Sequence, residues 1–223
     1  MFSGFTEETI AFFIDLKFHN NTTFFHQEHD RYVEMVQTPF YELIGELAPT
    51  MLKIDPCMEV RPHRCLSRIH RDTRFSRDKS PYRDHLWFLF RHEAEPREKA
   101  VFFYFEFGLE RLSWGMGIWG ENRELMDQFR RKMAANPEGM AGFVDDLELE
   151  KRKLYLGGSS FKRIEYPPEL PARLRPWYAA RELYIGKEIR DPAIAYEPRL
   201  TGQLKRDFNA LAPVYRMFRG LME

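Results

Sequence analysis

The residues whose types and spacing suit chemistry lie in one stretch, residues 68–83. This stretch has six cationic side chains and two carboxylates, hence a local charge of +4, whereas the whole chain has 34 basic and 34 acidic residues and no net charge. Guanidinium groups bind phosphate or carboxylate through paired hydrogen bonds, and hydroxyl groups complete such a shell. The stretch therefore predicts a site for a small anionic ligand. The predicted ligand-binding residues in it are Arg68, Arg71, Thr73, Arg74, Ser76, Lys79 and Tyr82.

Two residues of the same stretch are candidates for proton transfer. His70 and Asp72 are titratable groups beside arginines, which shift the pKa of a neighbour, and they are the predicted catalytic pair. An enzyme acting on a phosphorylated or carboxylated substrate is one form of this hypothesis, and the sequence leaves open whether the protein is an enzyme. No glycine-rich loop accompanies the stretch, so a P-loop nucleotide site is not supported.

Two further interpretations use the same residues. Basic side chains interleaved with Phe75, Tyr82 and Trp87 resemble a strip that contacts a nucleic-acid backbone and stacks on bases. The zero net charge argues against this alternative, because nonspecific nucleic-acid binding needs a wide basic face. In the third interpretation the stretch is a structural clasp, in which Asp72 and Asp78 pair with the arginines.

The spacing of the arginines predicts their local structure. Arginines at positions 68, 71, 74 and 77 would drift by roughly 60° per step around an α-helix, and on a strand they would alternate between the two faces. A strand end followed by an irregular loop brings most of them together. Ser80-Pro81 agrees with a loop, because this dipeptide starts turns.

Other catalytic and metal-binding patterns are not found in the sequence. The seven histidines form no HxH or HExxH motif, so no metal site is predicted, and no cofactor is indicated. Cys57 and Cys65 have no CxxC spacing and are expected to be ordinary thiols of a reducing compartment.

The first fifty residues are predicted to be helical. Thr6 and Asn21 are N-cap residues ahead of apolar residues at helical spacing. Thr38-Pro39 predicts the start of a third helix, which is expected to end at Pro49.

After Pro56 the apolar period changes from 3.6 to 2, which is typical of strands. The turns between the apolar runs are short, and short turns join antiparallel strands. The run at 85–91 is apolar at both parities, which predicts a central strand covered on both faces. The expected strands are 58–60, 66–70, 85–91, 101–107 and 112–119.

Gly115 and Gly117 are candidate ligand-contacting residues in the last of these strands. They share one face, whereas Trp114, Met116 and Ile118 share the other. Glycines in a strand indicate close approach of another group. That group is either a ligand near the basic stretch, or a helix or neighbouring aromatic side chain that fills the space.

The helical period returns after Asn122, with a second N-cap at Asn136-Pro137. An edge strand is expected at 161–164, a short helix at 177–185 and a terminal helix at 199–221. The sequence thus predicts a single α+β domain, 1–223, in which an antiparallel β-meander of about five strands packs with N-terminal and C-terminal helices.

The fifteen residues from Arg68 to Tyr82 resemble the signature of the family called domain of unknown function 2461. Gly4-Phe5, Asn20-Asn21, the segment 115–119 and the segment 154–168 lie where shorter blocks of that family lie. The resemblance covers nearly the whole chain and implies no activity, substrate or catalytic residue.

Composition bounds the class of protein. With 43% apolar and 15% aromatic residues the chain is expected to be globular. No stretch approaches the roughly 20 apolar residues of a membrane span, and the first residues lack a basic region followed by an apolar one. We therefore expect a soluble cytoplasmic protein with no membrane partner. Its oligomeric state is open.

Overall fold

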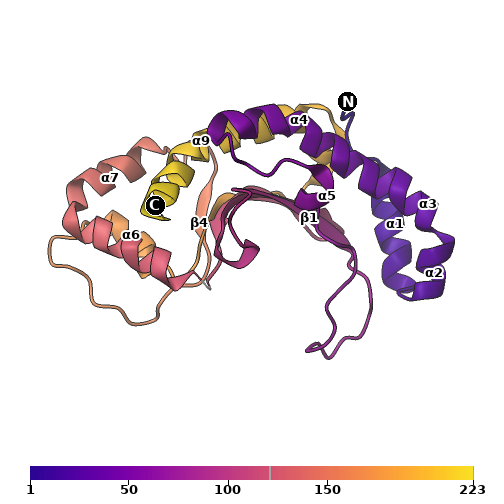
Figure 1. Ribbon diagram of the computed structural model, residues 1–223, viewed down its shortest axis with the longest axis horizontal. Coiled ribbons are helices and arrows are strands. Elements are labelled where there is room, and N and C mark those ends of the chain that lie inside the picture. The colour runs from indigo at the N-terminus through magenta and orange to yellow at the C-terminus, as the bar shows by residue number, and fades with distance from the viewer. Residues whose placement is uncertain (121, 223) are drawn as a thin grey trace. The chain divides into compact units, whose positions relative to one another are not determined.

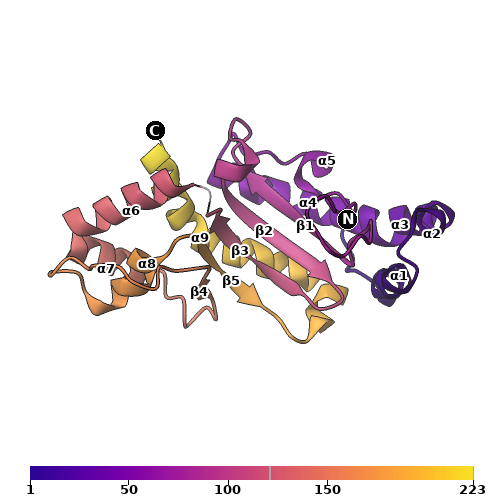
Figure 2. The ribbon, with the colours of Figure 1, turned by 90° about the horizontal axis from the view of Figure 1, so that it is seen from below.

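The protein is an α+β protein with one five-stranded antiparallel open sheet, as the sequence predicts. This computed structural model describes residues 1–120 and 122–222. The strand order is β1-β2-β3-β5-β4, and Figure 2 shows β1, β2, β3 and β5 side by side. The strands are β1 (His85–Arg91), β2 (Val101–Gly108), β3 (Leu112–Ile118), β4 (Tyr155–Gly157) and β5 (Leu183–Glu188).

The chain divides into two compact units, each built from three separated segments. Unit 1 comprises Met1–Phe90, Tyr104–Trp114 and Glu188–Lys205. Unit 2 comprises Arg91–Phe103, Gly115–Lys187 and Arg206–Glu223. The single domain expected from the sequence stays a prediction.

Unit 1 begins with a run of helices (Figure 1). The predicted caps are present: Thr6 is the N-cap of α1, and the Asn21 side chain accepts a hydrogen bond from the Phe24 N–H at 2.9 Å at the start of α2. These caps satisfy N–H groups that a first helical turn leaves without partners. The helices are α1 (Glu7–Phe18), α2 (Thr22–Gln27), α3 (His29–Tyr32), the π-helical turn η1 (Val33–Gln37), α4 (Thr38–Ile54), α5 (Pro62–Cys65) and the 3₁₀ turn η4 (Pro192–Tyr196).

The start predicted for α4 at Thr38-Pro39 is confirmed to within one residue, although Thr38 is not a cap, and the end predicted at Pro49 is wrong. Gln37 and Thr38 already have helical backbone angles, so the π-helical turn continues directly into α4, and the helix passes Pro49 to reach Ile54. A proline inside a helix removes a hydrogen bond and costs about 3 kcal/mol. The buried Met51 and Ile54 beyond Pro49 offset that cost, because each removes apolar surface from water.

Unit 2 contains most of the remaining helices, together with β4 and most of β5 at the second edge of the sheet. The Asn136 side chain caps α7 by accepting a hydrogen bond from the Gly139 N–H at 3.0 Å, as its position before Pro137 predicts. The elements are η2 (Arg97–Lys99), α6 (Arg123–Ala135), α7 (Pro137–Asp146), η3 (Ala172–Leu174) and α8 (Arg175–Ala179). The terminal helix α9 (Arg199–Met222) contributes residues to both units.

The strands expected at 58–60 and 66–70 are not strands of the sheet. Leu66 and His70 form only isolated bridges, to Phe88 and Tyr82, because Pro62 starts the helical turn α5 just before them. β1, expected to be central, is instead the first strand of the sheet.

The two strands that complete the sheet, β4 and β5, lie where the sequence did not predict strands. The helix expected at 177–185 ends at Ala179, where the next residue is extended, and β5 follows at Leu183. The edge strand expected at 161–164 is wrong, because the edge strand is β4, Tyr155–Gly157, which pairs antiparallel with β5. In the described chain, segment 161–164 has no strand.

Each unit has an aromatic core. In unit 1, Phe5, Phe40, Phe88 and Phe105 are fully buried, with ring centroids 4.9 Å apart for Phe5 and Phe40 and 5.3 Å apart for Phe88 and Phe105. Such clusters add edge and stacking contacts to ordinary apolar burial. The opposite face of the same strands keeps His85, Trp87 and Glu106 half-buried.

Gly4 explains how the first residues reach this core. Its φ is +112°, and a Cβ at this position would lie 2.4 Å from the Tyr196 carbonyl oxygen. Only glycine accepts both conditions without strain. The close approach lets the Phe5 N–H donate to the Ala195 carbonyl at 2.9 Å, which places the Phe5 ring in the core.

The core of unit 2 contains Phe103, Phe208 and Tyr215, with ring centroids 5.2 to 5.3 Å apart. A buried ion pair joins β5 to α9, with Lys187 Nζ 3.0 Å from a carboxylate oxygen of Asp207. Among the described residues, no helix is both long and apolar enough to cross a membrane.

Candidate functional site

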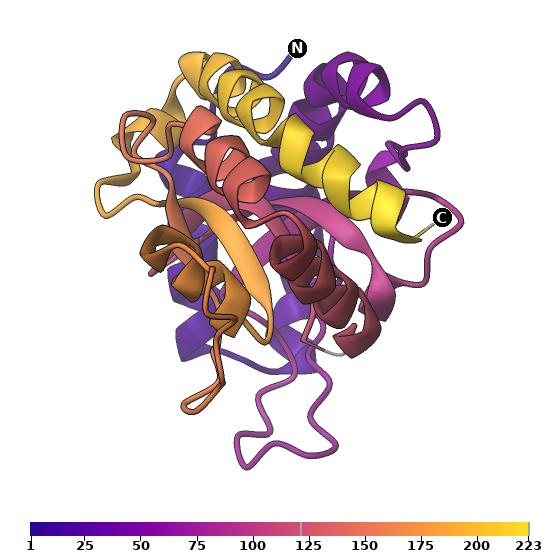
Figure 3. The ribbon, with the colours of Figure 1, turned by 90° about the vertical axis from the view of Figure 1, so that its left-hand side faces the viewer.

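The basic stretch forms a hairpin whose base is held by backbone hydrogen bonds. His70 and Tyr82 form an antiparallel bridge, the Arg71 N–H donates to the Pro81 carbonyl at 2.8 Å, and the Arg83 N–H donates to the Ile69 carbonyl at 2.9 Å. Figure 3 shows the loop, at the bottom of the view, extending away from the other elements of unit 1. We call residues 71–81 the basic hairpin.

Inside the basic hairpin, two arginines are paired with the two carboxylates. Arg74 donates from Nε to Asp72 at 3.0 Å and from its terminal nitrogen at 2.7 Å, and Arg71 pairs with Asp78. The Asp72 and Arg74 side chains are exposed, so solvent screens their attraction. This pairing agrees with the contacts expected of a clasp. It leaves neither arginine as an uncompensated charge.

The tip of the basic hairpin is shaped by contacts within the loop. Lys79 Nζ donates to the Thr73 carbonyl at 2.8 Å, and the Ser76 N–H donates to the same carbonyl at 3.3 Å. Phe75 is 94% exposed, with the Arg74 guanidinium 5.7 Å from its ring centroid. Thr73, Ser76 and Lys79 therefore order the loop through contacts within it.

The pairing predicts an acid-range titration for Asp72. The Arg74 hydrogen bonds hold the pKa of the Asp72 carboxyl at about 2, below its ordinary 3.8. Because the pKa is lowered in the folded protein, the pairing stabilises the hairpin above the ordinary pKa and is lost as pH falls toward 2. We expect a carboxyl carbon NMR midpoint near 2 in the wild type, rising toward 3.8 in Arg74→Gln. A wild-type midpoint near 3.8 would contradict the pairing.

A cavity of about 250 Å³ lies at the base of the hairpin, within unit 1. Arg68 and His70 of the basic stretch line it, together with side chains from α3, η1, α4 and α5. We call it the hairpin-base cavity. Its polar lining residues are His29, Tyr32, Gln37, Tyr41, His63, Ser67, Arg68 and His70.

The π-helical turn η1 places two of these residues together. Tyr32 precedes the turn and Gln37 ends it, and their side chains are hydrogen-bonded across the wider turn. Burial raises the pKa of Tyr32, so its phenol stays neutral and keeps its proton to donate. Single π-helical turns within helices occur often at functional sites.

Aromatic rings form the wall beside His70. The Phe25 and Tyr82 rings stack with centroids 4.3 Å apart, and the His70 ring lies 4.9 Å from that of Tyr82. Asn20 fixes this wall, because its side chain donates to the Tyr82 carbonyl at 3.0 Å and accepts from the Tyr82 N–H at 2.9 Å. Tyr82 itself is buried and supports the cavity from behind.

The electrostatics of the hairpin-base cavity favour an anion. Of the residues that line it, none is an aspartate or a glutamate. Arg68 is exposed, and no carboxylate of the described chain lies within ion-pair distance of its guanidinium. The cavity thus presents a fixed positive charge with imidazole, phenol and hydroxyl groups around it.

Arg83 lies on the other face of the ribbon. Its guanidinium is 4.7 Å from the Trp87 ring centroid, and its Nε is buried without a hydrogen-bond partner in the described chain. Burial and the nearby charge of Arg71 lower the pKa of Arg83. The cations of the basic stretch therefore have three surroundings. Arg74 and Lys79 lie in the basic hairpin, Arg68 lines the hairpin-base cavity, and Arg83 lies over Trp87 of β1.

Gly115 and Gly117 do not form an open floor. A Cβ on Gly115 would lie 2.1 Å from the Ile185 carbonyl oxygen, and one on Gly117 would lie 2.7 Å from the Tyr184 ring. Gly115 meets the backbone of β5, the neighbouring strand, and Gly117 meets the Tyr184 ring, so the interpretation in which an aromatic side chain fills the space holds for Gly117. The ligand-floor interpretation is corrected, because it did not include β5 in the sheet.

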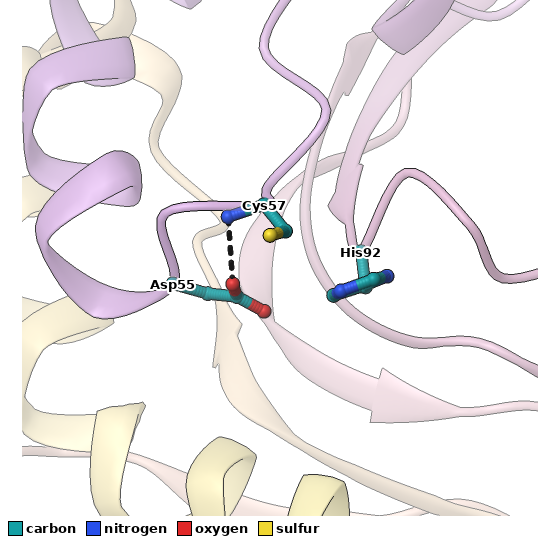
Figure 4. Close-up of side chains that lie close together, drawn as sticks. All are labelled: Asp55, Cys57 and His92. Atoms are coloured by element: carbon teal, nitrogen blue, oxygen red, sulfur yellow. Dashed lines mark hydrogen bonds between the residues drawn. The ribbon is translucent and has the colours of Figure 1, made fainter.

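Neither Cys57, which is exposed, nor Cys65, which is buried, is in a disulfide. The Cys57 N–H donates to the Asp55 side chain at 2.9 Å just beyond the end of α4 (Figure 4). This contact orders the turn that leaves the helix.

The catalytic pair proposed from the sequence is separated by the structure. His70 lines the hairpin-base cavity, whereas Asp72 is bound by Arg74 on the hairpin and is not among the residues that line it. Sequence reasoning missed the cavity residues contributed by the helices. Of these residues, His29 and His63 are histidines that form no motif with each other or with the basic stretch, so no signal in the sequence joins them.

Comparison with protein-family models matches residues 8–217 to the model described as "Conserved hypothetical protein (DUF2461)". A search of curated proteins finds no match to the chain.

Proposed function

The chain belongs to the DUF2461 family of conserved hypothetical proteins, and from that premise we propose that it binds a small anionic ligand in the hairpin-base cavity. The observation that carries the proposal is a lining that combines Arg68 with proton-donating side chains and contains no aspartate or glutamate. A guanidinium without a carboxylate partner keeps its donors available for an anion from solution, and charge-assisted hydrogen bonds are the strong ones.

The size of the cavity limits the ligand. Sites for drug-sized molecules commonly have volumes of roughly 300 to 1,000 Å³, and this one has about 250 Å³. A phosphate or carboxylate group on a small molecule fits that space. Arg68 holds the anion, and Ser67 and Tyr41 complete its shell.

Where the ligand is a substrate, His70 is the proton-transfer group of the proposal. Its ring lies in the cavity wall, and imidazole exchanges protons near neutral pH. Asp72 has a different role: a carboxyl whose pKa is about 2 is a weak base at neutral pH, so it orients Arg74. The proposal includes a cytoplasmic location, which suits two cysteines that form no disulfide.

The test is a calorimetric titration of the protein with inorganic phosphate. We expect Arg68→Gln to weaken phosphate binding at least about tenfold, because a charge-assisted hydrogen bond contributes about 1.5 to 3 kcal/mol. Arg77→Gln is the matched control, since it removes the same charge from an exposed arginine of the basic hairpin that does not line the cavity. Equal losses in the two variants would show diffuse attraction and contradict a site at Arg68.

The alternative function is nucleic-acid binding, which the exposure of Phe75 beside Arg74 favours. A second titration, with an oligonucleotide, distinguishes it from binding of a small anion. A single-stranded oligonucleotide of about ten residues should bind more weakly than phosphate and independently of Arg68. Tight, salt-sensitive binding that Phe75→Ala abolishes would replace the proposed function with nucleic-acid binding.

A further inference from the structure

A second cavity, of about 480 Å³, lies within unit 2. Residues 156–161, from the end of β4 through the loop after it, form one side of the cavity. Tyr166 lies on the proline-rich segment that follows, and residues of η3 and α8 form the other side. We call it the Ser159 cavity. Its volume falls in the range of sites for small molecules.

The loop of the Ser159 cavity is held in one conformation. Gly158 has a φ of +102°, and a Cβ there would lie 2.5 Å from the Glu182 carbonyl oxygen, so glycine is required. The Ser159 N–H donates to the Glu182 side chain at 3.1 Å, and the Arg181 N–H donates to the Ser159 carbonyl at 2.8 Å. A loop fixed on both sides loses little freedom when a ligand binds.

Two aromatic side chains line this cavity and remain open to solvent. Phe161 is 43% exposed and Tyr166 is 38% exposed. The Arg175 guanidinium lies 5.4 Å from the Tyr166 ring centroid, and that of Arg130 lies 5.0 Å from the Phe161 ring centroid. Exposed rings at the edge of a cavity are suited to stacking on a planar ligand.

The cations beside the two rings have different roles. Arg130 is committed to the fold: it donates to the Tyr178 carbonyl at 3.0 Å and to the Ala180 carbonyl at 2.6 Å. Arg175 lines the cavity, and within the part of the chain that the structure describes no carboxylate lies within ion-pair distance of its guanidinium. The Arg181 guanidinium lies 5.6 Å from the Phe161 ring centroid, but Arg181 is not among the residues that line the cavity. Arg175 is therefore the lining cation positioned for a ligand.

We propose that the Ser159 cavity binds a small molecule with a planar ring and an anionic group, the chemistry of a nucleoside monophosphate. The ring stacks on Tyr166 and Phe161, while Arg175 and the hydroxyl groups of Ser159 and Ser160 hold the anion. The lining supports this chemistry, because it contains aromatic, hydroxyl and guanidinium groups but no aspartate or glutamate. This site is independent of the hairpin-base cavity, which lies in the other unit.

The test is a calorimetric titration of the full chain with adenosine monophosphate. We expect Tyr166→Ala and Arg175→Gln each to weaken binding at least tenfold. Adenosine and ribose 5-phosphate, which carry the ring and the anion separately, should each bind at least tenfold more weakly than the nucleotide. The matched controls are Phe75→Ala and Arg131→Gln, which change exposed residues away from this cavity and should leave affinity unchanged.

Two outcomes would overturn the proposal. One is the absence of nucleotide binding by the wild type at millimolar concentration. The other is an affinity that follows Arg68→Gln rather than Arg175→Gln, which would assign the nucleotide to the hairpin-base cavity. Thermal melting of each variant identifies any loss of binding that arises from unfolding, and in that case Tyr166→Leu replaces Tyr166→Ala. Loss of phosphate binding at Arg68 alone would bear on the proposed function and leave this site intact.

Discussion

Replacing Gly115 with valine should destabilise the protein by about 3 kcal/mol, the upper end of the usual cost of overpacking. The Cβ of any other residue would lie 2.1 Å from the Ile185 carbonyl oxygen and 2.6 Å from the Gly186 Cα. These are backbone atoms of β5, which cannot rotate out of the way as a side-chain end can. The strand pairing between β3 and β5 must therefore shift or break.

Urea unfolding of Gly115→Val, followed by circular dichroism, measures this cost. The matched control is Gly142→Ala in α7, where a Cβ meets nothing within 4 Å. Because alanine favours a helix over glycine, this control should stabilise the protein by about 0.5 to 1 kcal/mol. A Gly115→Val cost below about 1 kcal/mol would mean that β5 does not lie against β3 here, and would return Gly115 to the list of candidate ligand contacts.

Asp207→Ala should destabilise the protein by about 3 to 5 kcal/mol. Lys187 and Asp207 have side chains that are 11% and 6% exposed, and the ammonium lies 3.0 Å from the carboxylate. Removing the carboxylate leaves a buried ammonium without its counter-charge. The same unfolding measurement applies, with Glu197→Gln as the control.

The control breaks the pair between Glu197 and Arg199, whose side chains are 42% and 69% exposed. Exposed pairs contribute at most about 1 kcal/mol, so a small effect is expected there. The double replacement Lys187→Met with Asp207→Leu should recover most of the lost stability, because it removes both charges. Equal costs for Asp207→Ala and Glu197→Gln would contradict the burial of the pair.

Local signals were enough to predict the helix starts and three strands. Asn21 and Asn136 cap helices through contacts three residues away, and such contacts can be read from adjacent sequence. The strands β1, β2 and β3 follow from the period of their apolar residues and from the short turns between them.

The strands at the second edge of the sheet, β5 and β4, could not be predicted from local sequence signals. The segment 177–185 has apolar residues that suit either a short helix or a strand, and its extended state depends on pairing of β5 with β3 and β4. The partners of that pairing are distant in sequence. The continuation of α4 past Pro49 depends likewise on the burial of Met51 and Ile54 in a core that the helix sequence does not contain.

By itself, the sequence determined where the charge lies and which family signature it carries, because composition and spacing are properties of adjacent residues. Only the tertiary structure decided what each cation does. Asp72 and Asp78 neutralise Arg74 and Arg71 through the fold of the hairpin, while Arg68 meets helices from positions 29 to 63 around a cavity without carboxylates. The electrostatic role of an arginine depends on the charges and the solvent within a few ångströms of it, and that neighbourhood is set by the packing of segments far apart in the chain.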